Sequence, residues 1–170
     1  MIPTLATERL VLRPPEVADF APFSSHYMSP RSTYEGGPHS REGAWKEFAT
    51  GAAGWMLRGY GTLSVIDAAS GAYLGEIGIY HLATYPEPEI GWMVLPEAEG
   101  RGIAAEAARA LRGWAYAEKG WTTLVSYIDP ENARSIRLAA RLGARLDPEG
   151  PHPEDDPCLV WRHPAPEALA

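Results

Sequence analysis

Cysteine is almost absent: Cys158 is the single one among 170 residues, so the chain can form no disulfide with itself. Cysteine and histidine never cluster at the spacing of metal ligands, and no metal site is predicted. No segment reaches the roughly 20 apolar residues that span a bilayer. Charged side chains also interrupt the start of the chain, where a signal peptide would need an apolar core. These absences predict a cytoplasmic protein with no membrane partner.

Positive charge is scarce in this chain. Lysine and arginine number 15 against 22 aspartate and glutamate residues, which gives a net charge of -7 at pH 7. Over most of the surface such a charge repels nucleic acid phosphates, so no nucleic acid partner is expected. The same field tolerates a cationic amine better than an anionic substrate.

Internal repeats, low-complexity tracts and long linkers are missing as well. A length of 170 residues suits one hydrophobic core, and the hydrophobic share of 45% is ordinary for a globular chain. We therefore expect one domain, residues 1–170, with one active site.

The periodicity of the apolar residues predicts a mixed α+β fold with a mostly antiparallel sheet. Helices are expected over residues 16–27, 41–56, 104–119 and 132–142. Strands are expected over residues 9–14, 61–67, 73–80, 89–95, 122–128, 144–146 and 158–161. Short connections make the strands from 61 to 95 an antiparallel meander. Residues 32–38, which contain two glycines and a proline, are expected to form a mobile loop.

The most informative segment is 95–106, where a strand ends, Gly100 and Gly102 follow, and a long helix begins at once. Free backbone amides and the positive end of the helix dipole would meet there, and glycine lets a phosphate approach the backbone closely. A tight turn that needs glycine only for its dihedral angles would have the same composition. The segment is neither a dinucleotide fingerprint nor a P-loop, because the third glycine and the Gly-Lys-Ser/Thr sequence are missing.

Residues 99–104, Glu-Gly-Arg-Gly-Ile-Ala, resemble the pyrophosphate loop of the GNAT superfamily of N-acetyltransferases. That pattern is Gln or Arg, two residues, Gly, one residue, then Gly or Ala. Gly102 and Ala104 match it, whereas Glu99 replaces Gln or Arg. Three further segments, 7–13, 89–94 and 132–143, resemble the branch that contains the ribosomal-protein N-terminal acetyltransferases.

The resemblance implies a GNAT fold, in which a single central sheet, flanked by helices on both faces, splays between its fourth and fifth strands. It implies acetyl-CoA as co-substrate, with the pantetheine arm in the gap and paired with the backbone at Met93 and Val94. It also implies that backbone amides hold the pyrophosphate, those of Gly100, Arg101, Gly102, Ile103, Ala104 and Ala105, with Arg101 adding charge.

Asn132 and Ser135 match the family's polar pair beside the pantetheine and the thioester sulfur. Asn132 is also a favoured helix N-cap, and Ser135 would be a solvated helical serine if it had no such role. Glu99 places a carboxylate near the pyrophosphate, which lowers affinity unless it turns outward or pairs with an arginine such as Arg101. Ala105 lacks the hydroxyl often found there, and one hydrogen bond is worth about 0.5 to 1.5 kcal/mol.

The implied reaction transfers acetyl to a primary amine, a small molecule or a peptide N-terminus, by direct attack through a tetrahedral intermediate. An ammonium has a reference pKa of about 10.4, so a carboxylate or an ordered water must accept its proton. Glu89 is the first candidate base and Glu76 the second. The Met93 amide is the candidate oxyanion donor, and Ser135 the candidate proton donor to the thiolate, with Tyr127 as its alternative.

Acceptor contacts are expected from the first-half helices and loop, where bulky and charged residues gather: Tyr27, Arg31, Tyr34, Glu35, Trp45 and Trp55. Most of these aromatics are expected in the core, and Glu35 is the candidate contact to a cationic amine. Arg134, Arg137 and Arg141 form a helical stripe that is either solvated or directed at the nucleotide 3'-phosphate.

Two further hypotheses stay open. A degenerate member of the family would bind acyl-CoA without turnover, as a sensor or interaction module. A homodimer through the exposed C-terminal strands is possible because unpaired strand edges invite pairing.

Overall fold

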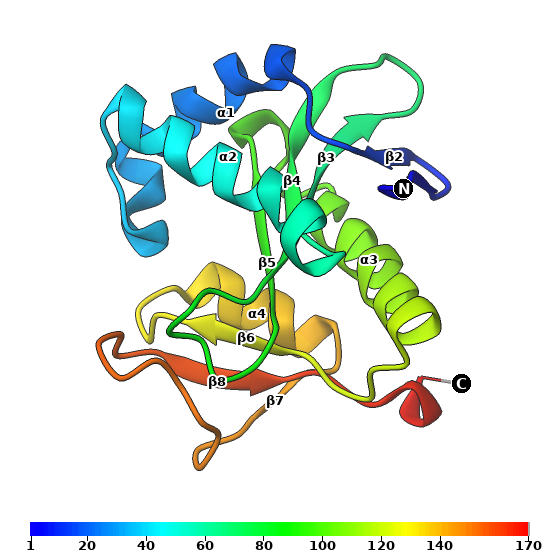
Figure 1. The fold of residues 1–170 in the computed structure, drawn as a ribbon, viewed down its shortest axis with the longest axis vertical. Helices are drawn as coiled ribbons and strands as arrows, with labels where there is room; N and C mark the ends of the chain where they lie inside the picture. The colour runs from blue at the N-terminus through cyan, green and yellow to red at the C-terminus, as the bar shows by residue number, and fades with distance from the viewer. Residues whose placement is uncertain (170) are drawn as a thin grey trace.

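Eight strands form one sheet in the computed structural model, which describes residues 1–169 (Figure 1). The strands are β1 Leu5–Ala6, β2 Leu10–Arg13, β3 Thr62–Asp67, β4 Tyr73–Tyr80, β5 Glu89–Val94, β6 Val125–Ile128, β7 Arg145–Leu146 and β8 Leu159–Arg162. Their order is β1-β2-β3-β4-β5-β6-β8-β7, and every neighbouring pair is antiparallel except β5 and β6. The mixed, mostly antiparallel sheet predicted from the sequence is confirmed.

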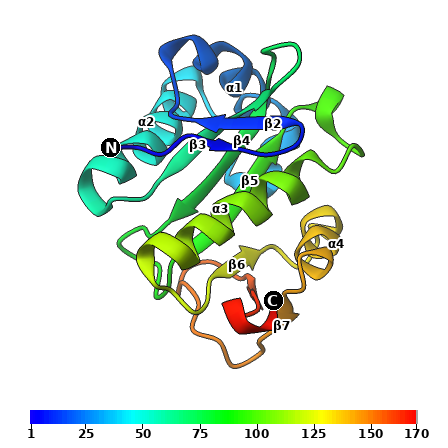
Figure 2. The same ribbon diagram turned by 90° about the vertical axis from the view of Figure 1, so that its right-hand side faces the viewer.

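Helices cover both faces of this sheet, as expected. The α-helices are α1 Phe20–Tyr27, α2 Arg41–Arg58, α3 Ile103–Lys119 and α4 Ala133–Arg141. Short 3₁₀ helices are η1 Val17–Asp19, η2 Pro30–Glu35, η3 Pro96–Ala98 and η4 Pro166–Ala168. In Figure 2, α3 lies in front of the sheet and α1 and α2 lie behind it. None of the helices within residues 1–169 is long and apolar enough to cross a membrane.

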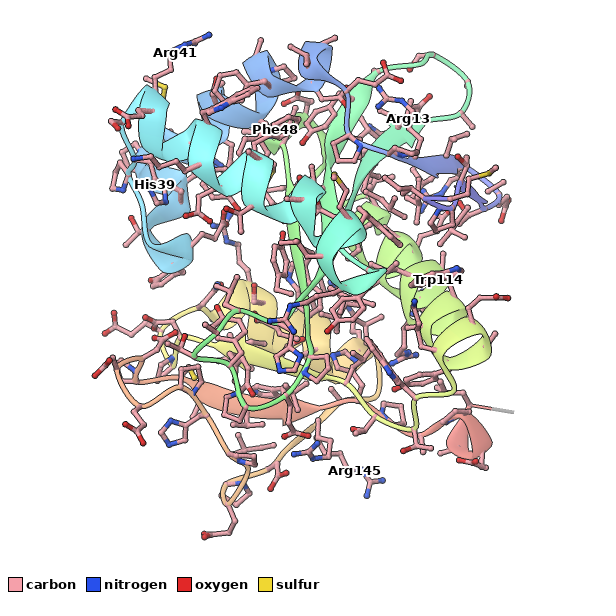
Figure 3. All side chains as sticks on the ribbon, viewed as in Figure 1. Arg13, His39, Arg41, Phe48, Trp114 and Arg145 are labelled. Atoms are coloured by element: carbon pink, nitrogen blue, oxygen red, sulfur yellow. The ribbon has the colours of Figure 1, made fainter. Side chains whose placement is uncertain are left out.

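The core is divided by the sheet into two main clusters. Phe48 points from α2 towards α1 (Figure 3), where it packs against Phe20 and Phe23 and where Met93 of β5 joins them. On the other face, α3 buries small apolar side chains such as Ala108 against the strands. Because side chains alternate along a strand, β5 contributes Met93 to one face and its neighbours Trp92 and Val94 to the other.

Two segments differ from the sequence-based prediction. Residues 32–38 were expected to be a loop, but most of them belong to η2, which Ser29 caps by accepting a hydrogen bond from the Arg31 amide at 3.2 Å. The Ser-Pro start is a helix signal, and the two glycines that follow mark only where the helix ends. The strand expected over 122–128 begins at Val125, because the residues before it form the connection from α3.

The parallel pairing of β5 and β6 covers a single register position, Glu89 with Val125, and the strands then diverge (Figure 1). A continued parallel ladder would next join the Tyr127 amide to the Ile90 carbonyl. Instead, the Tyr127 amide donates to Glu89 Oε1 at 3.1 Å, and Ser126 Oγ donates to the Ile90 carbonyl at 2.6 Å. Two side chains thus replace the missing ladder bond, and the predicted splay begins at this point.

A buried polar chain supports this branch point. Arg112 Nη1 of α3 donates to the Leu142 carbonyl at 2.8 Å and lies 3.2 Å from His163 Nδ1. Burial, aided by Arg112, lowers the pKa of His163 to about 3, so the imidazole is neutral. Arginine only donates, so Nδ1 accepts and the proton sits on Nε2, 3.0 Å from Ser126 Oγ. These hydrogen-bonded side chains therefore connect α3, the end of β8, β6 and β5.

The substitution Ser126→Ala tests the branch point. It leaves the Ile90 carbonyl and the His163 Nε2 proton without partners in the core, which costs about 1 to 3 kcal/mol. A chain of this size loses about 2 to 4 °C of Tm for each kcal/mol. We expect calorimetry to show a Tm lower by several degrees. Ser25→Ala, on the exposed side of α1, is the control, and equal Tm values for both variants would contradict the role of Ser126.

Candidate active site

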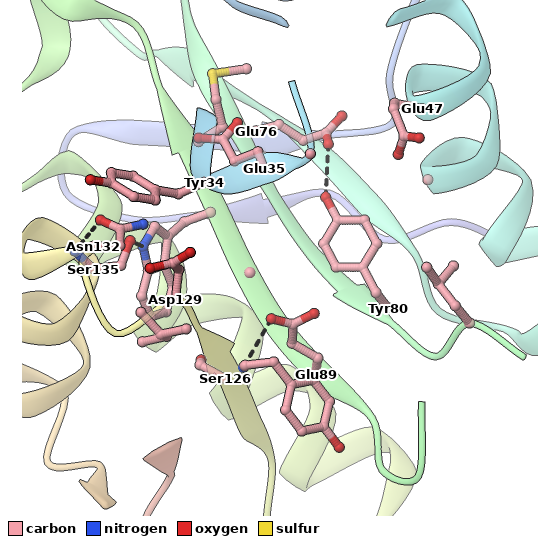
Figure 4. Close-up of a pocket in the computed structure, with 18 of the residues that line it drawn as sticks. Tyr34, Glu35, Glu47, Glu76, Tyr80, Glu89, Ser126, Asp129, Asn132 and Ser135 are labelled. Atoms are coloured by element: carbon pink, nitrogen blue, oxygen red, sulfur yellow. Dashed lines mark hydrogen bonds between the residues drawn. The ribbon is translucent and has the colours of Figure 1, made fainter. Parts of the chain in front are cut away.

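A cavity of about 560 Å³ lies where the meander, the first-half helices and the gap between β5 and β6 meet (Figure 4). Its lining comes from several parts of the chain. These parts are α1 to η2 with Tyr34 and Glu35, α2 with Glu47, β4 and β5 with Glu76, Tyr80, Glu89 and Met93, β6 with Ser126 and Tyr127, the region of α4 with Asp129, Asn132 and Ser135, and the loop before β8 with Asp156.

The floor of the cavity is the paired surface of β4 and β5. Gly78 stands opposite Gly91, and Tyr80 stands opposite Glu89. A Cβ atom would lie 2.9 Å from the Tyr80 ring at Gly78 and 3.2 Å from it at Gly91, so the two glycines make room for that ring. Tyr80 can therefore lie across the floor, and its hydroxyl donates to Glu76 Oε1 at 3.0 Å.

Glu76 is the deepest carboxyl group of the cavity, with 4% of the residue exposed. One oxygen accepts from Tyr80, and Oε2 has no hydrogen-bond partner among the described residues. Burial raises the pKa of Glu76 to about 8, against the opposing effect of the Tyr80 and Thr62 hydroxyls, and the negative charges of Glu35 and Glu47 add to the rise. Without a cation beside it, this carboxyl group is largely protonated at neutral pH.

Glu89 is half-buried and lines the same cavity. Burial raises its pKa to about 8, and the charge of Asp156 acts in the same direction, while the hydrogen bond from the Tyr127 amide opposes them. The structure therefore brings both predicted base candidates, Glu89 and Glu76, into one cavity. It also gives Glu89 a second task, at the branch point of the sheet, that the sequence did not reveal.

The backbone of β5 presents alternate groups to β4 and to the gap. The Leu95 amide bonds to the Leu74 carbonyl at 2.8 Å, towards β4, whereas the Ile90 carbonyl faces β6. By this alternation the Val94 amide points into the gap, and the Met93 amide points towards β4. The Met93 amide, predicted from the sequence to be the oxyanion donor, therefore faces the β4 ladder, whereas the Val94 amide faces the gap.

Asn132 and Ser135 line the cavity from the start of α4. Asn132 Oδ1 accepts from the Ser135 amide at 3.2 Å, so the interpretation of Asn132 as an N-cap is confirmed. Ser135 Oγ accepts from Trp92 Nε1 at 3.2 Å, which leaves its own hydrogen for donation. The Tyr127 hydroxyl, the alternative donor, instead donates to the Pro151 carbonyl at 3.3 Å.

The glycine loop before α3 has the conformation of an anion cradle. Gly100 and Gly102 have φ values of 71° and 77°, in the left-handed region that favours glycine. A Cβ atom at Gly100 would meet nothing within 4 Å, so the approach is open. No side chain caps the α3 N-terminus at Gly102, which leaves the first-turn amides to a ligand. These features fit a pyrophosphate group.

Two side chains of this loop find partners that the sequence did not indicate. Glu99 Oε1 accepts from Arg31 of η2 and from Arg134 of α4, the latter at 2.8 Å. The expectation that Glu99 pairs with an arginine is confirmed, but the partner is not Arg101, because Arg101 Nη2 lies instead 3.6 Å from Asp67 Oδ2 at the end of β3. Of the arginine stripe on α4, Arg134 is thus directed at the loop.

The acceptor-side residues are divided between core and surface. Tyr27 and Trp55 are buried as expected, whereas Tyr34 and Trp45 are exposed. Glu35 lines the cavity and lies 2.9 Å from His26 Nε2, so its carboxylate already has one partner.

Comparison with known proteins places this geometry in a family. Residues 9–145 match the family model described as an acetyltransferase (GNAT) domain. The acetyltransferase from Agrobacterium tumefaciens str. C58 has a similar solved structure, with a TM-score of 0.91, 45% sequence identity, and coverage of 96% of this chain and 95% of that one.

Two curated relatives match over shorter segments. The uncharacterized protein YkkB of Bacillus subtilis is 36% identical over 90 residues, and the match spans 51% of this chain and 52% of that protein, about half of its length. The L-2,4-diaminobutyric acid acetyltransferase of Streptomyces coelicolor is 32% identical over 124 residues, which span 64% of this chain and 71% of that protein. The chain belongs to the GNAT family of acetyltransferases and has the GNAT fold.

Proposed function

We propose that this chain transfers the acetyl group of acetyl-CoA to a primary amine by direct attack through a tetrahedral intermediate. The observation that carries the proposal is the junction of two features: the cavity with Glu76 and Glu89, and the gap beside β5 that leads to the glycine loop. Membership of the GNAT family supports acetyl-CoA as the co-substrate. Two carboxyl groups with raised pKa values in this cavity favour catalysis over the sensor hypothesis.

Acetyl-CoA supplies the thioester, and the chain supplies its binding groups. The backbone amides from Gly100 to Ala105, through Arg101, Gly102, Ile103 and Ala104, are the proposed pyrophosphate ligands. The positive end of the α3 dipole adds to their attraction. The gap-facing backbone of Val94 is the proposed partner of pantetheine, next to Met93, and Asn132 and Ser135 stand at the same gap.

Glu89 is the proposed general base. A pKa near 8 is well matched to accepting a proton around neutral pH, and the half-buried side chain is open to the cavity. A bound ammonium group would lower the pKa of Glu89 and of Glu76, because an opposite charge favours the ionised carboxylate. Glu76 stays the second candidate, since it lines the same cavity and its Oε2 has no partner at hydrogen-bond geometry.

The remaining roles fall to the gap. The Val94 amide is the proposed oxyanion donor in place of Met93, because it points away from the β4 ladder. Ser135 is the proposed donor of a proton to the departing thiolate, since its hydroxyl hydrogen is not used in the bond from Trp92.

The acceptor is a small-molecule amine or a peptide N-terminus. The relative from Streptomyces coelicolor acts, by its name, on a small diamino acid, which favours the first. Assignment to the branch of ribosomal-protein N-terminal acetyltransferases, which favours the second, stays a prediction.

Glu89→Gln tests the base. The amide keeps an oxygen for the Tyr127 N-H but cannot take a proton, and general bases contribute about 10²- to 10⁴-fold. We expect kcat/KM, measured by free-thiol release from acetyl-CoA, to fall by at least about 10²-fold. In the parent protein kcat/KM should rise about tenfold per pH unit and level off above about pH 8, the pKa of Glu89, and the variant should lose this rise.

Glu76→Gln is the matched variant, because Gln keeps an acceptor for the Tyr80 hydroxyl. Glu118→Gln, on the exposed side of α3, controls for the loss of charge. If Glu89→Gln keeps the rate and pH profile of the parent protein and Glu76→Gln loses both, the general base is Glu76 and not Glu89.

Glu99→Gln tests the glycine loop. The change removes a negative charge close to the proposed pyrophosphate site while Arg31 and Arg134 stay. A gain of about 1 kcal/mol, typical of one partly solvated charge, corresponds to roughly fivefold tighter CoA binding. Calorimetry should show this lower Kd, and the difference should shrink in high salt. Glu97→Gln, exposed in η3, is the control. Weaker binding in Glu99→Gln would mean that Glu99 instead positions the two arginines for the ligand.

A further inference from the structure

The cavity has a strongly one-sided charge. Six carboxyl groups line it: Glu35, Glu47, Glu76, Glu89, Asp129 and Asp156. Among the described residues, neither lysine nor arginine contributes to the lining, and His39 is the one titratable nitrogen there. Elsewhere the protein pairs many of its carboxylates with arginine, as Glu99 and Glu106 show. The negative charge of the cavity is therefore a local feature rather than a consequence of net charge alone.

These carboxyl groups are spread from the floor to the rim. Glu76 is buried at the floor, and Glu35, Glu89 and Asp129 are half-buried in the walls. Glu47 of α2 and Asp156 of the loop before β8 are exposed. Figure 4 shows Glu47 and Asp129 on opposite sides of Glu76 and Glu35. A molecule that enters the cavity would meet carboxyl groups at several depths and from both sides, and a cation among them would favour their ionised form.

Most of this charge has no cationic partner in the protein. Within the described residues, Glu35 is the one member of the set with an ion pair, to His26. Glu76, a side chain more than nine-tenths buried, lines the cavity, and its Oε2 has no partner at hydrogen-bond geometry, although the Thr62 hydroxyl lies close to the carboxyl group. When this carboxyl group is ionised, a buried acceptor without a donor is costly, and the cavity that it lines is where a donor would come from. An ammonium group, with three donors and a positive charge, matches that need.

We infer that the acceptor carries at least two ammonium groups, and is a diamine or polyamine rather than a monoamine or a peptide. This inference rests on the proposed acetyl transfer at the same site. One amine would lie by Glu76 and Glu89 and react, while a second ammonium would pair with the outer carboxylates, foremost Glu47. A monoamine would leave the outer carboxylates unpaired, and the carboxylate of a free peptide or amino acid would be repelled by them.

The rest of the lining fits such a molecule. Aromatic rings flank the carboxyl groups, those of Tyr27, Tyr34, Tyr80, Tyr85 and Tyr127. Ring faces pack against methylene chains and attract cations. The volume of about 560 Å³ is in the range of small-molecule sites.

The chemical step balances without another reactant. The reacting ammonium loses a proton to the carboxylate, its nitrogen forms a C–N bond to the acetyl carbon, and the C–S bond breaks. The second proton that the nitrogen sheds goes with the thiolate as the thiol. The distal ammonium keeps its protons and its charge throughout.

The deciding experiment compares 1,5-diaminopentane with pentylamine, which has the same chain length and one ammonium fewer. Free-thiol release from acetyl-CoA should give a kcat/KM at least about tenfold higher for the diamine, the effect of one well-placed ion pair. The preference should shrink as salt rises. Glu47→Gln should raise KM for the diamine and leave pentylamine unchanged, and Glu118→Gln should change neither.

Two failures can be told apart. Equal kcat/KM for the two amines, or a preference for the dipeptide alanyl-alanine, would overturn the inference while leaving the acetyltransferase in place. If no amine releases thiol, the proposed function fails, and calorimetry on the CoA-loaded protein then decides. Binding of the diamine that is tighter than that of pentylamine and weakened by Glu47→Gln supports the inference, and equal or absent binding overturns it.

Discussion

Parallel pairing between β5 and β6 ends after one register position, and the site depends on that interruption. Opening a sheet exposes backbone groups that need partners. Here the Glu89 carboxylate accepts a hydrogen bond from the Tyr127 amide, and Ser126 Oγ donates one to the Ile90 carbonyl. Behind them the Arg112 and His163 side chains brace the branch point from α3 and β8. The branch point is thus held by defined hydrogen bonds, while further along the gap the Val94 amide stays directed away from β4.

This arrangement couples the fold to the chemistry through one residue. Glu89 ends the ladder with one oxygen and faces the cavity that holds Glu76 and Tyr80. Its backbone position is set by pairing with Tyr80 across β4 and β5. A general base in this position would need no mobile segment to hold it, because the strands on both sides fix it.

Charge is separated along the gap. At the loop end, glycine amides, the α3 N-terminus and the arginines around Glu99 form a surface suited to phosphate. At the cavity end, carboxyl groups line the site without lysine or arginine among the described residues. An anionic co-substrate and a cationic acceptor would therefore each be attracted to its own end, and both would be repelled from the other. The net charge of -7 conceals this division.

Much of the fold could be predicted because it depends on patterns within contiguous stretches of sequence. The meander, α3 and the glycine loop each rest on local propensity or on a short motif. The choice of Glu89 and Glu76 as base candidates rested on their places on the central strands and on the resemblance to the family. Local signals failed where glycine and proline mark helix ends as readily as loops, as in η2.

Only the tertiary structure decided which groups meet. Several features join segments that are far apart in sequence. They are the partners of Glu99, the orientation of the Val94 amide, the hydrogen-bonded side chains Arg112, His163 and Ser126, and the six carboxyl groups in one cavity. A single chain records which residues are present and their local periodicity. Strand register and helix packing set the long-range distances on which ion pairs and hydrogen bonds depend, and no local pattern encodes them.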